Sequence, residues 1–142
     1  MKKLLFLLAA ATSVALANAQ KVLQRDVPSS VKTSLQKQFP DAKNVKWEKE
    51  DRNYEAGFKV KETGYSVLLN ASGNVIETEV VISINSLGSQ IKEYVAKNYP
   101  GHKIKEAAKI TDGRGIVTYE AEVNGKDLIF DNAGNFLKEI ID

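Results

Sequence analysis

Apolar residues recur at every fourth position in two stretches of the chain, residues 27–39 and residues 87–99. This spacing places them on one face of a helix. A proline follows each stretch, and proline cannot continue a helix. The sequence therefore predicts two amphipathic helices that end before Pro40 and Pro100. The apolar positions are Val27, Val31, Leu35 and Phe39 in the first helix, and Leu87, Ile91, Val95 and Tyr99 in the second.

After each helix the pattern changes to an alternation of apolar and polar residues. Such alternation predicts antiparallel β-strands with one buried face. The strand patterns also repeat, because the tripeptide Tyr-Glu-Ala at residues 54–56 returns at residues 119–121. A glycine-containing turn around Gly73 has a counterpart around Gly134. The helix and the strands after it therefore form one unit that occurs twice.

We predict an α+β fold of two tandem units, at residues 25–84 and residues 85–142. Each unit is a helix followed by a four-stranded antiparallel sheet, with the helices packed on one sheet face. A unit of about 60 residues buries little core by itself, so we expect the two units to share one sheet or to pack closely. Asn124-Gly125 predicts a two-residue hairpin turn, whereas residues 61–64 suggest a longer loop.

Strand alternation also assigns side chains to the two faces of the sheet. Trp47 has the parity of Val45, which predicts burial under the first helix. If the apolar neighbours of Leu68 and Ile129 face the helices, these two side chains point outward and are exposed. Exposed apolar residues rimmed by charge are typical of a binding surface. The predicted partner-binding residues are Leu68, Ile129, Val75, Glu48, Lys59, Glu77 and Glu120.

Residues 1–19 have the features of a secretory signal peptide. Lys2 and Lys3 precede a short apolar run, and Ala17-Asn18-Ala19 is an A-x-A cleavage site. The run is shorter than the roughly 20 apolar residues that a membrane span needs. We therefore expect cleavage after Ala19, no membrane insertion of the mature chain, and a periplasmic or secreted location.

Composition narrows the classes of function. Without the two leader lysines, the chain has 18 basic and 18 acidic residues, so it presents no basic footprint for nucleic acid. It has no cysteine and a single histidine, His102, which does not suffice for a His- or Cys-based metal site. Ser29, Ser30 and Ser34 of the first predicted helix have no visible acid–base neighbour of the kind that activates a nucleophile. We expect no metal, no cofactor and no catalytic residue.

The segment Phe39-Pro40-Asp41-Ala42, the alternating strands after it and the turn 73–77 together resemble the PepSY-like family, which is also described as beta-lactamase-inhibitor-like. The resemblance covers nearly all of the mature chain, although the second unit has no counterpart of Trp47. It implies an exported bacterial protein with a fold like that of the beta-lactamase inhibitor protein. In that fold, helices cover one sheet face and the other face is free to hold a partner.

These observations favour an exported, non-enzymatic binding module that engages a protein or peptide of the cell envelope through its open sheet face. Apolar burial would supply affinity, and the surrounding charges would set orientation and association rate. The alternative is an envelope protein that binds a small ligand or a cation through its acidic strand residues, because paired carboxylates can also bind calcium.

The leader prediction is tested by intact-mass spectrometry of the exported protein. The chain should begin at Gln20, because the A-x-A site ends at Ala19. A mature protein that still contains residues 1–19 would contradict it.

Overall fold

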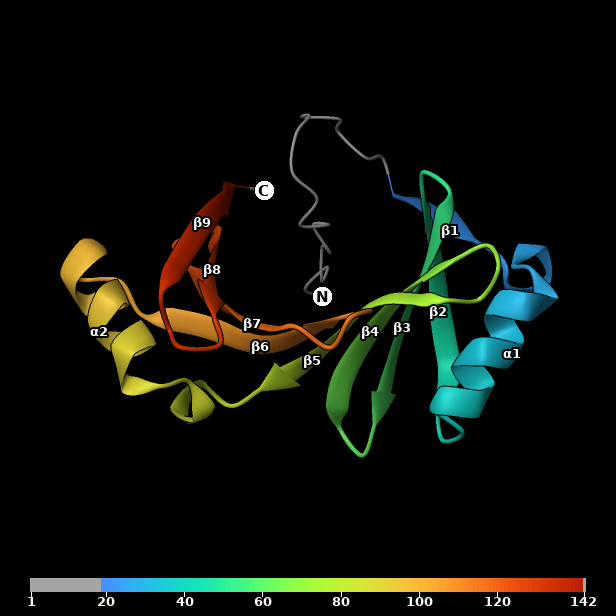
Figure 1. The fold of residues 1–142 in the computed structure, drawn as a ribbon, viewed down its shortest axis with the longest axis horizontal. Helices are drawn as coiled ribbons and strands as arrows, with labels where there is room; N and C mark the ends of the chain where they lie inside the picture. The colour runs from blue at the N-terminus through green and yellow to red at the C-terminus, as the bar shows by residue number, and fades with distance from the viewer. Residues whose placement is uncertain (1–18, 142) are drawn as a thin grey trace. The chain divides into compact units, whose positions relative to one another are not determined.

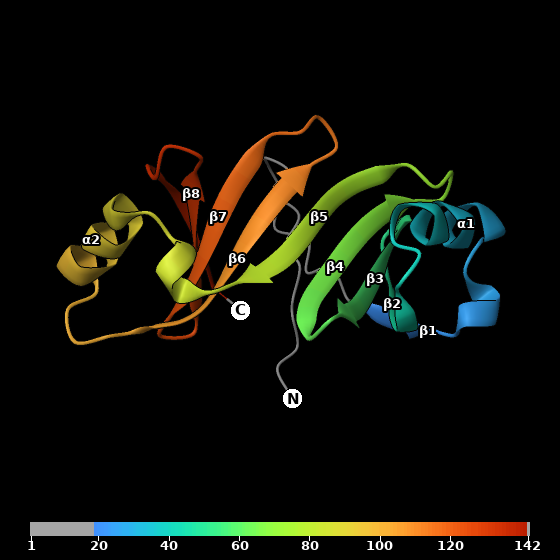
Figure 2. The same cartoon turned by 90° about the horizontal axis from the view of Figure 1, so that it is seen from below.

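The computed structural model describes residues 19–141, in which it places two α-helices and nine β-strands. The predicted signal peptide, apart from Ala19, lies outside the described residues. The chain divides into two compact units between Thr78 and Glu79. Each unit contains one helix, which Figures 1 and 2 show beside the strands of its own unit.

In the first unit the helix begins directly after Pro28 and ends at Gln38, and the backbone N–H of the capping residue Phe39 donates to the Leu35 carbonyl. A short strand that the sequence did not predict precedes the helix. The elements are β1 (Gln20–Val22), a 3₁₀ turn (Gln24–Asp26), α1 (Ser29–Gln38), β2 (Lys43–Glu50), β3 (Asn53–Val60), β4 (Thr63–Asn70) and β5 (Val75–Ile82), which runs through the boundary.

The second unit has the same order after its helix. Neighbouring strands pair antiparallel in chain order within both units. The elements are a 3₁₀ turn (Ile84–Ser86), α2 (Ser89–Asn98), β6 (Ile104–Asp112), β7 (Val117–Val123), β8 (Lys126–Asp131) and β9 (Phe136–Ile141).

The core of the first unit lies between α1 and one face of the sheet. Val31 and Leu35 of the helix pack with Trp47, which is 4% exposed, as the alternation predicts. Trp47 lies opposite Ala56 on β3, and Ala56 lies opposite Val67 on β4. The small alanine side chain leaves room for the indole ring. Complete burial of each large apolar side chain contributes about 1.5–3 kcal/mol.

The core of the second unit has its own helix stripe and its own strand residues. Ile91 and Val95 of α2 pack on Ala107, Leu128 and Phe130. At the end of α2, the Tyr99 hydroxyl donates a hydrogen bond to Glu139, which also pairs with Lys126 at 2.8 Å. That hydrogen bond raises the pKa of Tyr99 to about 12. The two predicted stripes are therefore confirmed as core faces, each within its own unit.

The hairpin turn between β3 and β4 is tighter than the sequence suggested. Val60 pairs with Thr63, so only Lys61 and Glu62 connect the strands, and Gly64 belongs to β4. Both turn residues have a positive φ, at 48° and 68°. A two-residue turn needs this conformation, although residues other than glycine and asparagine rarely adopt it. The prediction of a longer loop was wrong because the expected turn residues are missing. The predicted turn at Asn124-Gly125 is confirmed, with φ values of 52° and 73°.

The turn after β4 packs against the beginning of α1. Ser30 Oγ donates to the Ala71 carbonyl at 2.8 Å, and Gly73 lies against the Ser30 backbone with a φ of 88°. The corresponding turn of the second unit touches α2, where Gln90 donates to Asn135 at 2.8 Å. These contacts fix each helix to the last hairpin of its own unit, β4–β5 in the first and β8–β9 in the second.

Replacing Gly73 with alanine should destabilise the protein more than replacing Gly125. Both glycines have a positive φ, which costs an alanine about 1–2 kcal/mol. Only at Gly73 would the new Cβ meet backbone, with Ser30 O at 2.6 Å, whereas nothing lies within 4 Å of a Cβ at Gly125. Urea denaturation followed by circular dichroism measures both losses. Equal losses would show that the contact between turn and helix is not tight.

Candidate functional site

A row of paired residues crosses the face of the first sheet that points away from α1, here called the outer face. Lys21 lies opposite Glu48, Glu48 opposite Glu55, and Glu55 opposite Leu68. Side chains alternate along a strand, and the chain neighbours Val22, Trp47, Ala56 and Val67 all face the helix-side core. The row therefore points outward, and it places two carboxylates directly across from each other.

Glu55 is the buried centre of this row, with only 5% of the residue exposed. Ser66 Oγ donates to its Oε1 at 2.9 Å. Its other oxygen, Oε2, is buried and accepts no hydrogen bond from the described residues. An unsatisfied buried polar atom costs about 1–3 kcal/mol, and like charges directly opposite each other destabilise a strand pair. The site thus lowers the stability of the folded protein locally, and interactions elsewhere in the fold compensate for this loss.

The electrostatics of the site favour a proton on Glu55. Burial is the main cause, the hydrogen bond from Ser66 opposes it, and the nearby carboxylates of Glu50 and Glu48 add to it, as does a side-chain hydrogen bond that Glu55 donates to Glu50, so that the pKa of Glu55 rises to about 8. Burial also raises the pKa of Glu50, with further contributions from Glu48 and Asp51. The two buried carboxyls interact, because a proton on Glu55 favours the charged form of Glu50. We call Glu48, Glu50 and Glu55 the acidic cluster.

Gly57 leaves space on the outer face beside the acidic cluster. It lies two residues from Glu55 on β3 and opposite Lys46 on β2. A Cβ at Gly57 would meet a single atom, the Lys46 carbonyl oxygen, at 3.8 Å. The side chains of Lys46 and Lys59 are exposed, so they can move without disturbing the core.

The predicted exposure of Leu68 and Ile129 was wrong. Both residues lie outside the helix-side cores, as their parity predicts, yet Leu68 is 1% exposed and Ile129 is 5% exposed. Each stands in the interior of a sheet with long side chains opposite it, Glu55 at Leu68 and Lys138 at Ile129. The apolar stem of a lysine such as Lys138 can cover a neighbouring residue while its ammonium group stays hydrated, and Glu55 is itself buried beside Leu68.

Val75 was assigned to the wrong face, because it packs against the helix-side core of the first unit. Lys59 is exposed on the outer face, as predicted. Glu77 is buried, Glu120 is half-buried, and both have interactions of their own. Of the seven predicted residues, the structure brings Glu48 and Leu68 together beside Glu55, and Lys59 lies nearby on β3.

Glu50 and Glu55 are not among the seven predicted partner-binding residues, although the alternative prediction of a ligand site on acidic strand residues includes residues of this kind. A signal for Glu55 was present, because the Tyr-Glu-Ala tripeptide keeps an outward glutamate between two helix-facing residues in both units. The second unit does not reproduce the cluster, since Ala108 lies opposite Glu120 where Glu48 lies opposite Glu55. The acidic cluster therefore belongs to the first unit.

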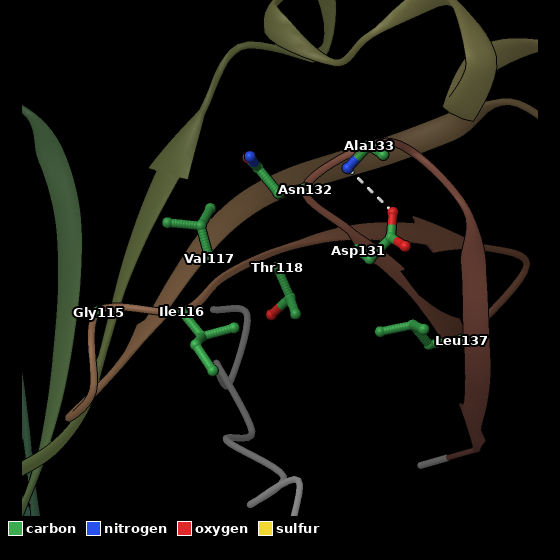
Figure 3. A pocket seen from close by; sticks show the side chains of 8 residues that line it. All are labelled: Gly115, Ile116, Val117, Thr118, Asp131, Asn132, Ala133 and Leu137. Carbon is green, nitrogen blue, oxygen red and sulfur yellow. Dashed lines mark hydrogen bonds between the residues drawn. The ribbon is translucent and has the colours of Figure 1, made fainter.

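A shallow hollow of about 570 Å³ lies in the second unit, and Figure 3 shows Ile116 and Leu137 on opposite sides of it. Both are about half exposed, at 50% and 53%. Asp131 also lines the hollow, but its carboxylate accepts hydrogen bonds from the backbone of Ala133 and Asn135 in its own turn. The hollow is mainly apolar.

Other candidate chemistry is sparse in the described part of the chain. Across residues 19–141, no three or more His, Asp or Glu side chains gather as metal ligands would. His102 is exposed. No helix in this range is long and apolar enough to cross a membrane. Ser66 and Glu55 form a hydroxyl–carboxylate pair, but Ser66 is 2% exposed and its oxygen is not presented to a substrate.

Stability should fall as the pH is raised from about 5 to about 8. The folded-state pKa of Glu55 is raised, so the folded protein holds a proton that the unfolded chain loses near pH 4.5. The slope reaches about 1.4 kcal/mol per pH unit for one such group. Glu55→Gln should flatten the slope, whereas the exposed Glu62→Gln should leave it unchanged. Urea unfolding followed by fluorescence of Trp47 measures this, and a Glu55→Gln protein with the wild-type slope would contradict the assignment.

Solved structures with similar folds come from Bacteroides species. A protein of Bacteroides eggerthii described as periplasmic has a TM-score of 0.73 at 14% identity, covering 80% of this chain and 87% of its own. A protein of Bacteroides uniformis from a family of unknown function has a TM-score of 0.71 at 16% identity, covering 79% and 87%. A BLIP-like protein of Bacteroides fragilis has a TM-score of 0.63 at 25% identity, covering 79% and 84%.

Comparison with curated proteins gives no significant match. The family model described as beta-lactamase-inhibitor-like and PepSY-like matches the sequence twice, at residues 14–77 and residues 60–138. The two matches together span most of the chain, and they agree with the resemblance drawn from Phe39-Pro40 and the strands that follow. The chain belongs to the PepSY-like, beta-lactamase-inhibitor-like family.

Proposed function

We propose that the protein is an exported, non-enzymatic binding module that engages a protein or peptide of the cell envelope through the outer face of its first unit. The two helix-plus-four-strand units act as tandem repeats, and the leader is removed after Ala19. Binding uses the acidic cluster together with the adjacent space over Gly57. Leu68 supports Glu55 from the next strand instead of serving as an exposed anchor.

The observation that carries this proposal is the buried, incompletely bonded carboxyl of Glu55 on the face that α1 does not cover. Its Oε2 accepts no hydrogen bond from the described residues, and Glu48 lies directly opposite it. An apolar side chain at this position would avoid the cost of a buried polar atom that accepts no hydrogen bond. Features that oppose stability are expected at functional sites.

Two further findings support a binding role over catalysis. The one hydroxyl–carboxylate pair of the site, Ser66 and Glu55, is buried and has no accessible nucleophile. The family is described as beta-lactamase-inhibitor-like, and the similar Bacteroides fragilis protein is described as BLIP-like. A protein that inhibits its partner is one form of such a module. The similar Bacteroides eggerthii protein, described as periplasmic, supports an envelope location.

Photo-crosslinking tests which face binds a partner. A photoreactive amino acid replaces Lys59 on the outer face or, as a control, Lys37 on α1; both residues are exposed. In cells that make the protein, the Lys59 variant should give a discrete crosslinked species, and the Lys37 variant should give none. Crosslinks at Lys37 alone would move the binding surface to the helix, and the absence of crosslinks at both positions would reject the proposal.

A further inference from the structure

We infer that the Asn124-Gly125 turn between β7 and β8 is a site of spontaneous covalent modification. Loss of ammonia through a cyclic imide converts Asn124 to aspartate or isoaspartate, and water is the only co-reactant. Three observations carry the inference: the glycine that follows the asparagine, the unrestrained amide of Asn124, and a matching turn in the first unit that has neither residue.

The reaction is an intramolecular displacement at the side-chain amide. The backbone nitrogen of Gly125 gives its proton to solvent and attacks Cγ of Asn124. The N–Cγ bond forms, the Cγ–Nδ2 bond breaks, and the amide nitrogen leaves with a proton as ammonia. Water then opens the five-membered ring at either carbonyl, which leaves aspartate or isoaspartate. A nucleophile held beside its electrophile reacts far faster than a free one, and glycine has no side chain to hinder the attack.

The structure leaves both reacting groups accessible. Asn124 and Gly125 are exposed, and nothing lies within 4 Å of a Cβ at Gly125. The side chain of Asn124 makes no hydrogen bond with the described residues, so it is free to rotate and bring Cγ to the Gly125 nitrogen. Asn124 is also the only asparagine of the sequence that precedes a glycine.

Other asparagines at turns are held in place. Asn70 Oδ1 accepts hydrogen bonds from the backbone N–H groups of Ser72 and Asn74, each at 3.0 Å. The amide of Asn135 donates to Asp131 at 3.0 Å. The residue after each of these asparagines carries a side chain, which hinders attack by its backbone nitrogen. Asn124 therefore combines an accessible amide with an unhindered nucleophile.

The Asp112-Gly113 pair has the same spacing without the same reactivity. A carboxylate resists this attack, because it has no ammonia to release. Asp112 Oδ1 also accepts hydrogen bonds from the backbone N–H groups of Arg114 and Ile116, at 2.8 Å and 2.9 Å. The Arg114 guanidinium holds Oδ2 at 3.0 Å. These bonds fix the carboxylate in its charged form, so this pair is an unreactive control within the same unit.

The corresponding turn of the first unit avoids this chemistry at a conformational cost. Each turn has two residues, and all four have a positive φ. The first turn is Lys61-Glu62, two residues that rarely adopt this conformation and that carry no amide side chain. Asn-Gly adopts it with little strain, yet it can react. The first unit therefore has the strained but inert turn, and the second unit has the relaxed but reactive one.

The two products differ in their effect on the second unit. Aspartate fits the turn, because Asp-Gly also favours it. Isoaspartate adds one carbon to the main chain within a turn that the pairing of Val123 with Lys126 closes. Val123 is fully buried in the second core, and Lys126 pairs with Glu139 at 2.8 Å. Isoaspartate should therefore destabilise the second unit at this end and leave the first unit unchanged.

Intact-mass spectrometry of the purified protein tests the site during incubation in mildly alkaline buffer, with circular dichroism to show that the protein stays folded. Each conversion adds about 1 Da, and peptide mapping should place it at Asn124. Asn124→Asp should gain no mass there. An unchanged mass, or a gain at other residues while Asn124 stays intact, would overturn the inference. Deamidation in urea but not in buffer would also overturn it, because the folded turn would then protect the amide.

Exchanging the two turns separates the residue pair from its place in the fold. The double variant Asn124→Lys, Gly125→Glu should gain no mass at this turn. The double variant Lys61→Asn, Glu62→Gly should gain a second reactive site, at position 61, because the turn there also has two residues. No reaction at position 61 would overturn the claim that such a turn permits the attack.

The effect on stability distinguishes the two products. The isoaspartate form, separated by ion exchange, should unfold at a lower urea concentration than Asn124→Asp, which has the same charge and an ordinary main chain. Equal midpoints would overturn the predicted weakening of the second unit.

Discussion

The alternation of side chains between two sheet faces constrains everything else in this molecule. Each unit has one helix, and one helix covers one face. The residues that face α1 or α2 form a conventional apolar core. The other face has no helix of its own unit packed on it in the described part of the chain, yet it also contains buried residues, among them Leu68 and Ile129. In the first unit Glu55 is one of these buried residues, and burial raises the pKa of its carboxyl.

The helices, the strand parity of Trp47 and the turn at Asn124-Gly125 could be predicted because each depends on residues close together in sequence. The exposure of Leu68 could not, because it depends on what lies opposite on the adjacent strand. For the same reason, the pairing of Glu48 with Glu55 was invisible: a shift of one residue in register would have separated them. The turn at residues 61–62 was missed because tertiary pairing imposed a conformation that these residues rarely adopt.

The two cores show how repeated units diverge without changing their elements. Trp47 fills the first core, and Ala107 occupies the matching position of the second, opposite Ala121. The second core regains aromatic volume from its helix, where Tyr94 stacks on Phe136 with ring centres 4.7 Å apart. The first core thus has its large aromatic side chain on a strand, at Trp47, and the second has one on its helix, at Tyr94. The outer faces diverged as well, since the second unit has Ala108 in place of Glu48.

The turns of this protein differ in their freedom to evolve. Those at Gly73 and Gly134 touch the helix of their own unit, whereas a Cβ at Gly115 or Gly125 would meet nothing within 4 Å. Turns that touch no helix can accept insertions at little cost. The helix-bound turns cannot lengthen without moving a helix. Relatives of this protein can therefore vary in size and acquire new recognition loops at turns such as those at Gly115 and Gly125, while the helix-bound turns keep the architecture constant.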